Sequence, residues 1–335
     1  MKESASAPSV AQRVPAHRLM RWGVECLASL GMPDESALLL AQSRIKMSLW
    51  GLDSHGVDRL PHDLDFLSRG LTHKERGIAI ESVSDSTARV DGGQGHGIIV
   101  AHDANQLAIT LALITGLGAV GVKNPLDCGA MALYTKRVAQ GKLLGIAVSR
   151  TDNIATEDDT ESPSSTGGTM VSISLPRDDG SLAHLGVDGS TLLLDRAEAV
   201  SLEIWTDSIL TWRREVRQIV SVLLTPMQSQ PLLREVLALA DLLVEDGPLF
   251  LVIDPSRLEG GPLVLADLER TVASLGRRLG SAKTHIEQES QEEIVRRLIG
   301  IPIASAVEQQ IIVWSESLGV AVPFIDPDCC PPVMQ

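Results

Sequence analysis

Strand-like and helix-like segments alternate through the first half of the chain, and this alternation constrains the fold more than any other feature. Residues 78–91 carry apolar side chains at alternate positions and end in a glycine turn, which predicts strands. A long apolar helical pattern runs from Ile98 to Thr115, and a short apolar strand follows at 119–122. A helix at 130–140 and a strand at 143–148 continue the series. The pattern predicts an α/β fold in which helices pack on a sheet.

The segments near both ends of the chain are helical by pattern. Residues 15–30 place apolar side chains on one side, and a second helix begins after Pro33 and extends to Leu49. A third helix is predicted from Leu60 to Arg69. In the C-terminal part, we expect helices at 287–299 and 303–318.

The second half of the chain is predicted in less detail. An acidic, Ser- and Thr-rich loop is expected at 152–168, and residues 1–12 are expected to be a frayed tail. The remaining predicted elements are strands at 169–176, 182–194 and 248–255, and helices at 201–224, 231–245 and 266–279.

Composition narrows the class of protein. Of 335 residues, 44% are hydrophobic and 21% charged, which is typical of a globular protein with a sizeable core. The formal charge of −14 argues against nucleic acid or an anionic membrane as a partner. There is no signal-peptide pattern, and we expect no apolar run of membrane-spanning length, so we predict a cytoplasmic protein. Cys26, Cys128 and the adjacent Cys329 and Cys330 lack zinc or disulfide spacing, which indicates free thiols and no metal site.

The segment from Gly51 to Pro61, GLDSHGVDRLP, concentrates chemically active side chains. His55 can exchange a proton near neutral pH, and Arg59 offers a planar fork of donors that fits a carboxylate. Ser54 can hydrogen-bond a substrate or relay a proton. The segment therefore suggests a site for a small acid, although a polar loop with solvated charges would have the same composition.

This segment, with RGLT shortly after it, resembles the N-terminal signature of the type-2 malate/L-lactate dehydrogenase family. That family includes sulfolactate and ureidoglycolate dehydrogenases and piperideine-2-carboxylate reductases. Weaker resemblances at 118–124, 250–255 and 297–302 follow in the same order along the chain. The resemblance implies NAD(P)-dependent oxidation or reduction of small 2-oxo, 2-hydroxy or 2-imino acids, and a homodimer.

The resemblance also implies an architecture distinct from the Rossmann fold. It predicts an α/β malate/L-lactate dehydrogenase-2-like fold, with N- and C-terminal helices packed together around a central α/β domain. We divide the chain accordingly into an N-terminal helical domain at 1–77, a central region for cofactor at 78–284, and C-terminal helices at 285–335.

The resemblance assigns catalytic roles to His55 and Ser54 and substrate binding to Arg59. Asp188, in a segment that resembles a family motif, is predicted to orient His55. Where many members carry a second histidine, this chain has Asp127. Either Asp127 takes part in proton transfer, or His55 acts alone, or the chemistry differs.

The cofactor site departs further from the family pattern. Family members have a glycine-rich loop with a lysine where this chain reads Thr225 to Pro231, without glycine or lysine. A phosphate group that approaches backbone amides favours both. The candidate cofactor residues that remain are Thr151, Gly168, Thr169 and Gly189.

Three functions stay open from the sequence. The first is an NAD(P)-dependent oxidoreductase with an altered cofactor site. The second is a non-redox enzyme on the same scaffold, for proton transfer, elimination or cyclisation, and the third is a non-catalytic binding protein.

Overall fold

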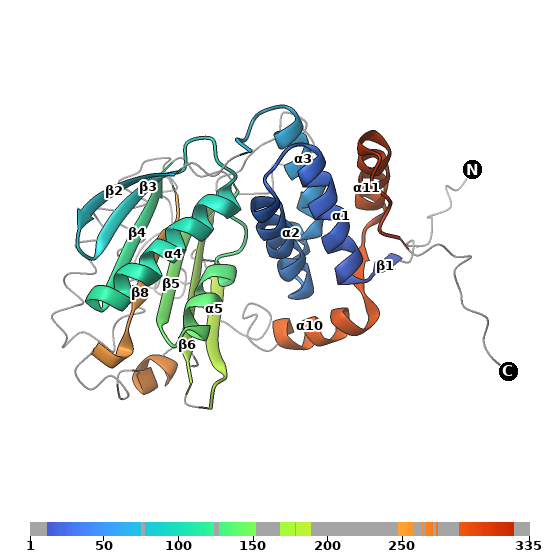
Figure 1. Ribbon diagram of the computed structural model, residues 1–335. Coiled ribbons are helices and arrows are strands. Elements are labelled where there is room, and N and C mark those ends of the chain that lie inside the picture. The colour runs from blue at the N-terminus through green and yellow to red at the C-terminus, as the bar shows by residue number, and fades with distance from the viewer. Residues whose placement is uncertain are drawn as a thin grey trace, which may run out of the picture. The chain divides into compact units, whose positions relative to one another are not determined.

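The chain divides into two compact units, which we describe separately. A computed structural model (Figure 1) describes residues 12–74, 78–123, 127–151, 168–177, 179–188, 247–257, 263, 265–270, 273 and 288–324. The helical unit comprises Met1–Glu75 and Gln288–Gln335, and the sheet unit comprises Arg76–Glu287. Residues 77, 284 and 285, beside the predicted domain boundaries, lie outside the described residues, so those boundaries stay predictions.

The helical unit is built from segments at both ends of the chain. Its helices are α1 (Ala16–Ser29), α2 (Asp34–Leu49), α3 (Leu60–Ser68), α10 (Gln288–Ile299) and α11 (Ser305–Leu318), close to the predicted ranges. Inside the unit, Trp22 Nε1 of α1 donates to Ser315 Oγ of α11 at 2.8 Å, and both residues are buried. The predicted packing of the N- and C-terminal helices against each other is thus confirmed.

A two-stranded sheet also links the two ends of the chain. Strand β1 (Gln12–Val14) pairs antiparallel with β9 (Ile301–Ile303), and Val14 lies opposite Ile301. Neither strand was predicted, because three residues are too few to show an alternating pattern. Residue 12 was expected to belong to the frayed tail, and the described structure places it in β1.

The sheet unit contains a seven-stranded mixed sheet in the order β2-β3-β4-β8-β5-β6-β7. Among the described strands, β3 and β4 pair in parallel and the other neighbours pair antiparallel. Its strands are β2 (Ala79–Ser84), β3 (Thr87–Asp91), β4 (Leu117–Lys123), β5 (Leu144–Thr151), β6 (Gly168–Pro176), β7 (Leu182–Asp188) and β8 (Leu249–Ile253). The predicted α/β fold is confirmed.

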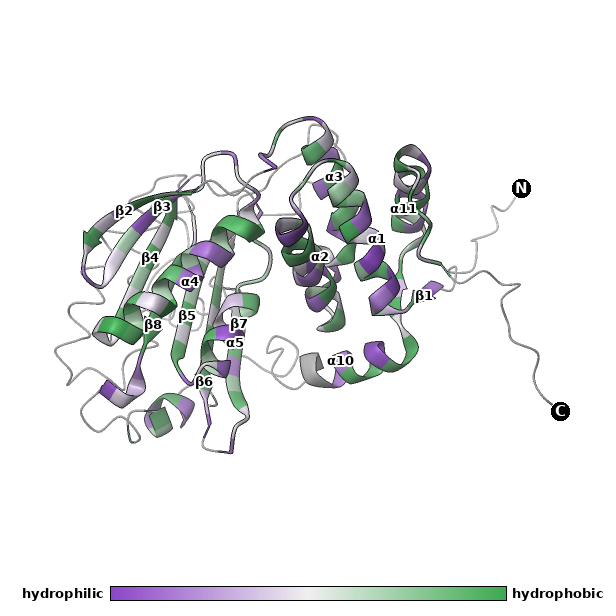
Figure 2. Cartoon of the chain, viewed as in Figure 1, coloured by the Kyte–Doolittle hydropathy of each residue, from purple (hydrophilic) through white to green (hydrophobic). Residues whose placement is uncertain are grey.

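Helices α4 (Gly97–Thr115) and α5 (Ala132–Gln140) belong to the same unit and share a buried apolar core with the sheet. Figure 2 shows hydrophobic residues along β8, whereas α1 and α2 of the other unit alternate between hydrophilic and hydrophobic. Helix α4 lies so close to β4 that a methyl group at Gly118 would overlap the Ala108 carbonyl oxygen. This close approach explains the glycine in an otherwise apolar strand.

Helix α4 also corrects an expectation from the sequence. Among the described residues it is one helix that is long and apolar enough to cross a membrane, by length and composition alone. The expectation that no apolar run reaches this length is therefore wrong. Half of the apolar window, 50%, is buried inside the sheet unit, as in a core helix.

Several predicted elements lie outside the described residues. They are the loop at 152–167, the end of the strand predicted at 182–194, the helices predicted at 201–224 and 231–245, and most of the helix predicted at 266–279.

Candidate active site

Residues 51–59, which we call the site loop, connect α2 to α3 in the helical unit. Gly51 has a φ of +83°, a left-handed conformation that glycine adopts without strain, and it redirects the chain after α2. Two short 3-10 turns follow, Asp53–His55 and Val57–Arg59, joined at Gly56. The first turn carries Ser54 and His55, and the second ends at Arg59, so the three predicted residues lie on one short loop.

The three side chains differ in exposure. Ser54 is exposed, whereas His55 and Arg59 are partly buried. Side chains that are partly open to solvent can reach a small molecule without a rearrangement of the loop. The loop therefore presents a hydroxyl, an imidazole and a guanidinium close together in sequence and accessible from solvent.

Ser48, in the last turn of α2, contacts the middle of the site loop. Its Oγ accepts a hydrogen bond from the Val57 N–H at 2.8 Å, and Ser48 is fully buried. A methyl group at Gly56 would overlap Ser48 Oγ. The glycine of the SHG motif is thus required here by the close approach of α2 to the loop backbone.

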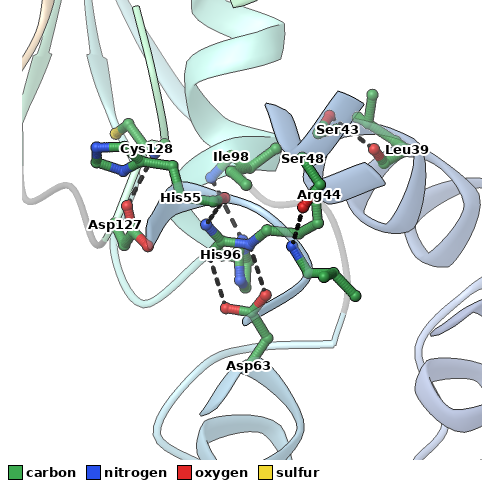
Figure 3. Close-up of polar contacts among 12 residues, drawn as sticks. Leu39, Ser43, Arg44, Ser48, His55, Asp63, His96, Ile98, Asp127 and Cys128 are labelled. Carbon is green, nitrogen blue, oxygen red and sulfur yellow. Dashed lines mark hydrogen bonds and ion pairs between the residues drawn. The ribbon is translucent and has the colours of Figure 1, made fainter. Parts of the chain in front are cut away.

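Arg44, one turn earlier on α2, is fully buried and uses three of its nitrogens (Figure 3). Nε and Nη2 each donate to the Asp63 carboxylate of α3 at 2.8 Å, and Nη1 donates to the His55 carbonyl at 2.9 Å. Asp63 is also buried, so the two opposite charges compensate each other away from water.

Arg296 of α10 contacts the other end of the loop. Its guanidinium donates to the Ser48 carbonyl at 2.8 Å, to Glu292 Oε1 at 2.6 Å and to both carboxylate oxygens of Asp53, with 3.0 Å to Oδ2. Burial alone would lower the pKa of Arg296, but the hydrogen bonds to Asp53 and Glu292 outweigh it and raise the pKa. The C-terminal segment therefore helps to hold the loop.

Asp58, in the second turn of the loop, is a partly buried carboxylic acid. Burial, reinforced by the nearby Asp53 carboxylate, raises the pKa of Asp58 to about 6, against the opposing effect of Arg296. Its Oδ1 is buried and has no hydrogen-bond partner within the described part of the chain. A carboxyl group in this setting favours the protonated form more than an exposed one does.

The other predicted site residues belong to the sheet unit. Asp127 Oδ1 accepts a hydrogen bond from the Gly129 N–H at 2.9 Å, just before α5. Asp188 is the last residue of β7 and pairs with Met170. Thr151, the last residue of β5, pairs with Gly168, the first of β6, and Thr169 pairs with Arg150. Gly189 and the segment Thr225–Pro231 lie outside the described residues.

The sequence analysis missed the residues that support the loop, namely Arg44, Ser48 and Arg296. For Arg44 a signal was present. It lies at helical spacing from Leu40, Ala41 and Ser48, on the buried side of α2, and a charge in such a position indicates a buried partner. Among the described residues, no group of three or more His, Cys, Asp or Glu side chains is arranged to hold a metal ion.

Comparison with known proteins shows what the chain resembles. The family model described as malate/L-lactate dehydrogenase matches residues 14–191, which is more than half of the chain and includes the site loop. A malate dehydrogenase of Pyrococcus abyssi is 35% identical over 136 residues, 41% of this chain and 38% of that protein. An L-sulfolactate dehydrogenase of Methanothermobacter thermautotrophicus is 32% identical over 128 residues, 38% of each chain. The sequence match thus spans well under half the length of these curated relatives.

Solved structures extend the likeness in fold to nearly the whole chain. The malate dehydrogenase of Pyrococcus horikoshii OT3 matches with a TM-score of 0.65 at 20% identity, over 96% of this chain and 100% of that chain. The delta1-piperideine-2-carboxylate reductase of Pseudomonas syringae matches with a TM-score of 0.60 at 16% identity, over 91% and 100%. At such identities the match supports the fold alone, and it agrees with the predicted departure from the Rossmann architecture. On the family match and the fold together, the chain belongs to the malate/L-lactate dehydrogenase family.

Proposed function

We propose that this protein is an NAD(P)-dependent oxidoreductase of a small 2-oxo, 2-hydroxy or 2-imino acid. The observation that carries the proposal is the site loop, which presents Ser54, His55 and Arg59 within the segment that matches the family. The names of the relatives, malate and sulfolactate dehydrogenases, support a small anionic substrate.

Each side chain has a role that its chemistry supports. Arg59 would bind the substrate carboxylate through two parallel hydrogen bonds. His55 would donate a proton to the substrate oxygen or nitrogen in reduction and accept it in oxidation. Ser54, exposed beside His55, would hydrogen-bond the same reacting group.

Two carboxylates of the sheet unit were candidates for the proton transfer. Asp127 already accepts a backbone hydrogen bond in its own turn, so we assign the proton to His55 instead. For Asp188, at the end of β7, we propose the role that the family resemblance implies, which is to orient the His55 imidazole.

The described candidate cofactor residues belong to the paired strands β5 and β6. Thr151 and Gly168 pair at one end of β5 and β6, and Thr169 is the next residue of β6. Hydroxyl groups are suitable partners for a ribose or an amide. When bound, the cofactor would supply or accept a hydride.

A cofactor titration tests this proposal. We expect NADH or NADPH to bind tighter than about 0.1 mM and to raise the melting temperature at millimolar concentration by mass action. If neither the cofactor fluorescence nor the melting temperature changed, the proposed redox function would be overturned.

Once a 2-oxo acid is found that oxidises the bound cofactor, two substitutions separate the roles. His55→Gln should lower kcat by about 10²- to 10⁴-fold, because a general acid is lost. Arg59→Met should raise KM by roughly ten- to a hundredfold, because a charged hydrogen bond to the carboxylate is lost. Arg69→Met, which removes an exposed arginine paired with Asp65 at the end of α3, is the matched control.

A second candidate function is a non-redox enzyme on the same scaffold. It is favoured by the absence of glycine and lysine from Thr225–Pro231 and by Asp127 at the place of a family histidine. Turnover of a small carboxylic acid without cofactor, lost in His55→Gln, would support this function. Binding of such acids without turnover would support a binding protein instead. We also propose a homodimer, to be checked by sedimentation.

A further inference from the structure

Two side chains of helix α2 bind backbone groups of the site loop, one at His55 and one at Val57 (Figure 3). Arg44 donates to the His55 carbonyl at 2.9 Å, and Ser48 accepts from the Val57 N–H at 2.8 Å. Between these two contacts lies Gly56, packed so closely on Ser48 that it has no room for a side chain. The peptide units on both sides of Gly56 are therefore bound by a single helix.

The two supporting residues form a matched pair on α2. Residues four apart lie on the same face of a helix, and both Arg44 and Ser48 are fully buried. A hydrogen bond shielded from water is electrostatically stronger than an exposed one. The contact from Ser48 is buried and the contact from Arg44 is part-buried, so both are at least partly shielded from water.

Asp63 fixes the arginine in turn. It accepts from Nε and Nη2 of Arg44, so the planar guanidinium has one orientation, and Nη1 is left to point at the His55 carbonyl. A lysine would balance the charge of Asp63, but its single nitrogen does not reproduce this fork.

We propose that Arg44 and Ser48 are positioning residues that determine the position and orientation of the His55 imidazole. The inference rests on the proposed function of His55. The backbone fixes where the Cα–Cβ bond of a side chain begins and points, and small displacements of a catalytic group reduce the rate strongly. The two residues act through the loop backbone and need no contact with substrate.

The test compares three variants of the full chain: Arg44→Lys, Ser48→Ala and Ser43→Ala. Ser43 is the matched control, because it lies on the same helix and its Oγ donates to the Leu39 carbonyl within α2. Histidines are labelled with ¹³C at Cε1, and the His55→Gln variant identifies the His55 signal. The chemical shift and pH titration of that signal are then followed in each variant.

We expect Arg44→Lys and Ser48→Ala to shift or broaden the His55 signal, and Ser43→Ala to leave it as in the native protein. Where a reducible acid has been found, the first two should lower kcat by about ten- to a hundredfold with a smaller change in KM. Ser48→Ala loses one neutral hydrogen bond, so it keeps the test valid if Arg44→Lys does not fold.

An unchanged His55 signal in a folded Ser48→Ala variant would overturn the positioning role, as would an equal change in Ser43→Ala. Failure of the proposed function gives a different result. The native protein would then neither bind NAD(P)H nor turn over any acid, while the histidine spectra would still report whether Arg44 and Ser48 set the position of His55.

Discussion

The site loop and the central sheet satisfy their backbone polar groups in different ways. In the sheet, strands β4, β8 and β5 pair through continuous backbone ladders among fully buried apolar side chains. In the loop, some backbone groups pair within short turns, but the His55 carbonyl is bound by the Arg44 side chain and the Val57 N–H by the Ser48 side chain. A ladder depends little on which residues form it, whereas the loop depends on these few side chains.

The difference implies different sensitivities to substitution. The apolar core of the sheet unit should respond mainly to changes of volume, because it is closely packed. The loop should respond mainly to changes of charge and hydrogen bonding, because each contact is made by one side chain. The predictions below test this contrast.

The largest effect is expected for Arg44→Met. Loss of the guanidinium leaves the buried Asp63 carboxylate without its partner, which should lower the free energy of unfolding by about 3–5 kcal/mol. Urea unfolding at pH 7 measures this. Removal of both charges, in Arg44→Met with Asp63→Leu, should recover much of the loss.

The control is Arg21→Met, which removes an arginine of α1 whose ion pair with Glu25 is exposed. It should leave the unfolding midpoint unchanged. If Arg44→Met had no more effect than Arg21→Met, charge would not hold the loop.

Two glycine substitutions, one in the loop and one in the sheet, should have effects of intermediate size on stability. Gly56→Ala in the loop and Gly118→Ala in β4 should each cost about 1–3 kcal/mol, because both positions are closed to a methyl group. The obstacle at Gly56 is chiefly the Ser48 hydroxyl, but at Gly118 it is the backbone of α4.

The cost of Gly56→Ala should therefore be smaller in a Ser48→Ala background. The measurement is the free energy of unfolding of each single and double variant. An equal cost of Gly56→Ala in both backgrounds would show that the α2 backbone at Ser48, and not the serine hydroxyl, limits the space.

The smallest effect, about 1 kcal/mol, is expected for Asp58→Asn and depends on pH. Because the pKa of Asp58 is raised to about 6 in the folded protein, its contribution to stability is present below its unfolded pKa and is lost as pH rises through about 6. Asparagine does not ionise, so the Asp58→Asn variant does not lose this stability as the pH rises. The effect is small because the carboxyl group is partly exposed to solvent.

Thermal unfolding at pH 8 and pH 4 measures this effect. Asp58→Asn should stabilise the protein at pH 8 and leave it nearly unchanged at pH 4. A gain of the same size at both pH values would mean that the raised pKa is not the cause.

Elements with strong local signals could be predicted from the sequence. Helices α1 and α2 begin directly after Pro15 and Pro33 and show clear apolar spacing or an acidic first turn. The family signature identified the loop with Ser54, His55 and Arg59. Whether these side chains converge on one substrate stays a prediction.

Contacts between distant residues could not be predicted in the same way. Arg296 and Asp53 are 243 positions apart, and each alone is an ordinary charged residue on a helix or a turn. The short strands β1 and β9 have too few residues for a periodic signal, and they form because each provides the other's hydrogen-bond partner. Both pairs form only when the fold brings distant parts of the chain together, and no local pattern in the sequence indicates them.

The pairing of β1 with β9 has a consequence for synthesis on the ribosome. Val14 pairs with Ile301 and Asp53 with Arg296, so synthesis must proceed past residue 301 before Val14 and Asp53 can both reach these partners. Such widely separated contacts make closure of the helical unit a late event. A chain cut short before residue 288 would carry the SHG motif without the anchor supplied by Arg296.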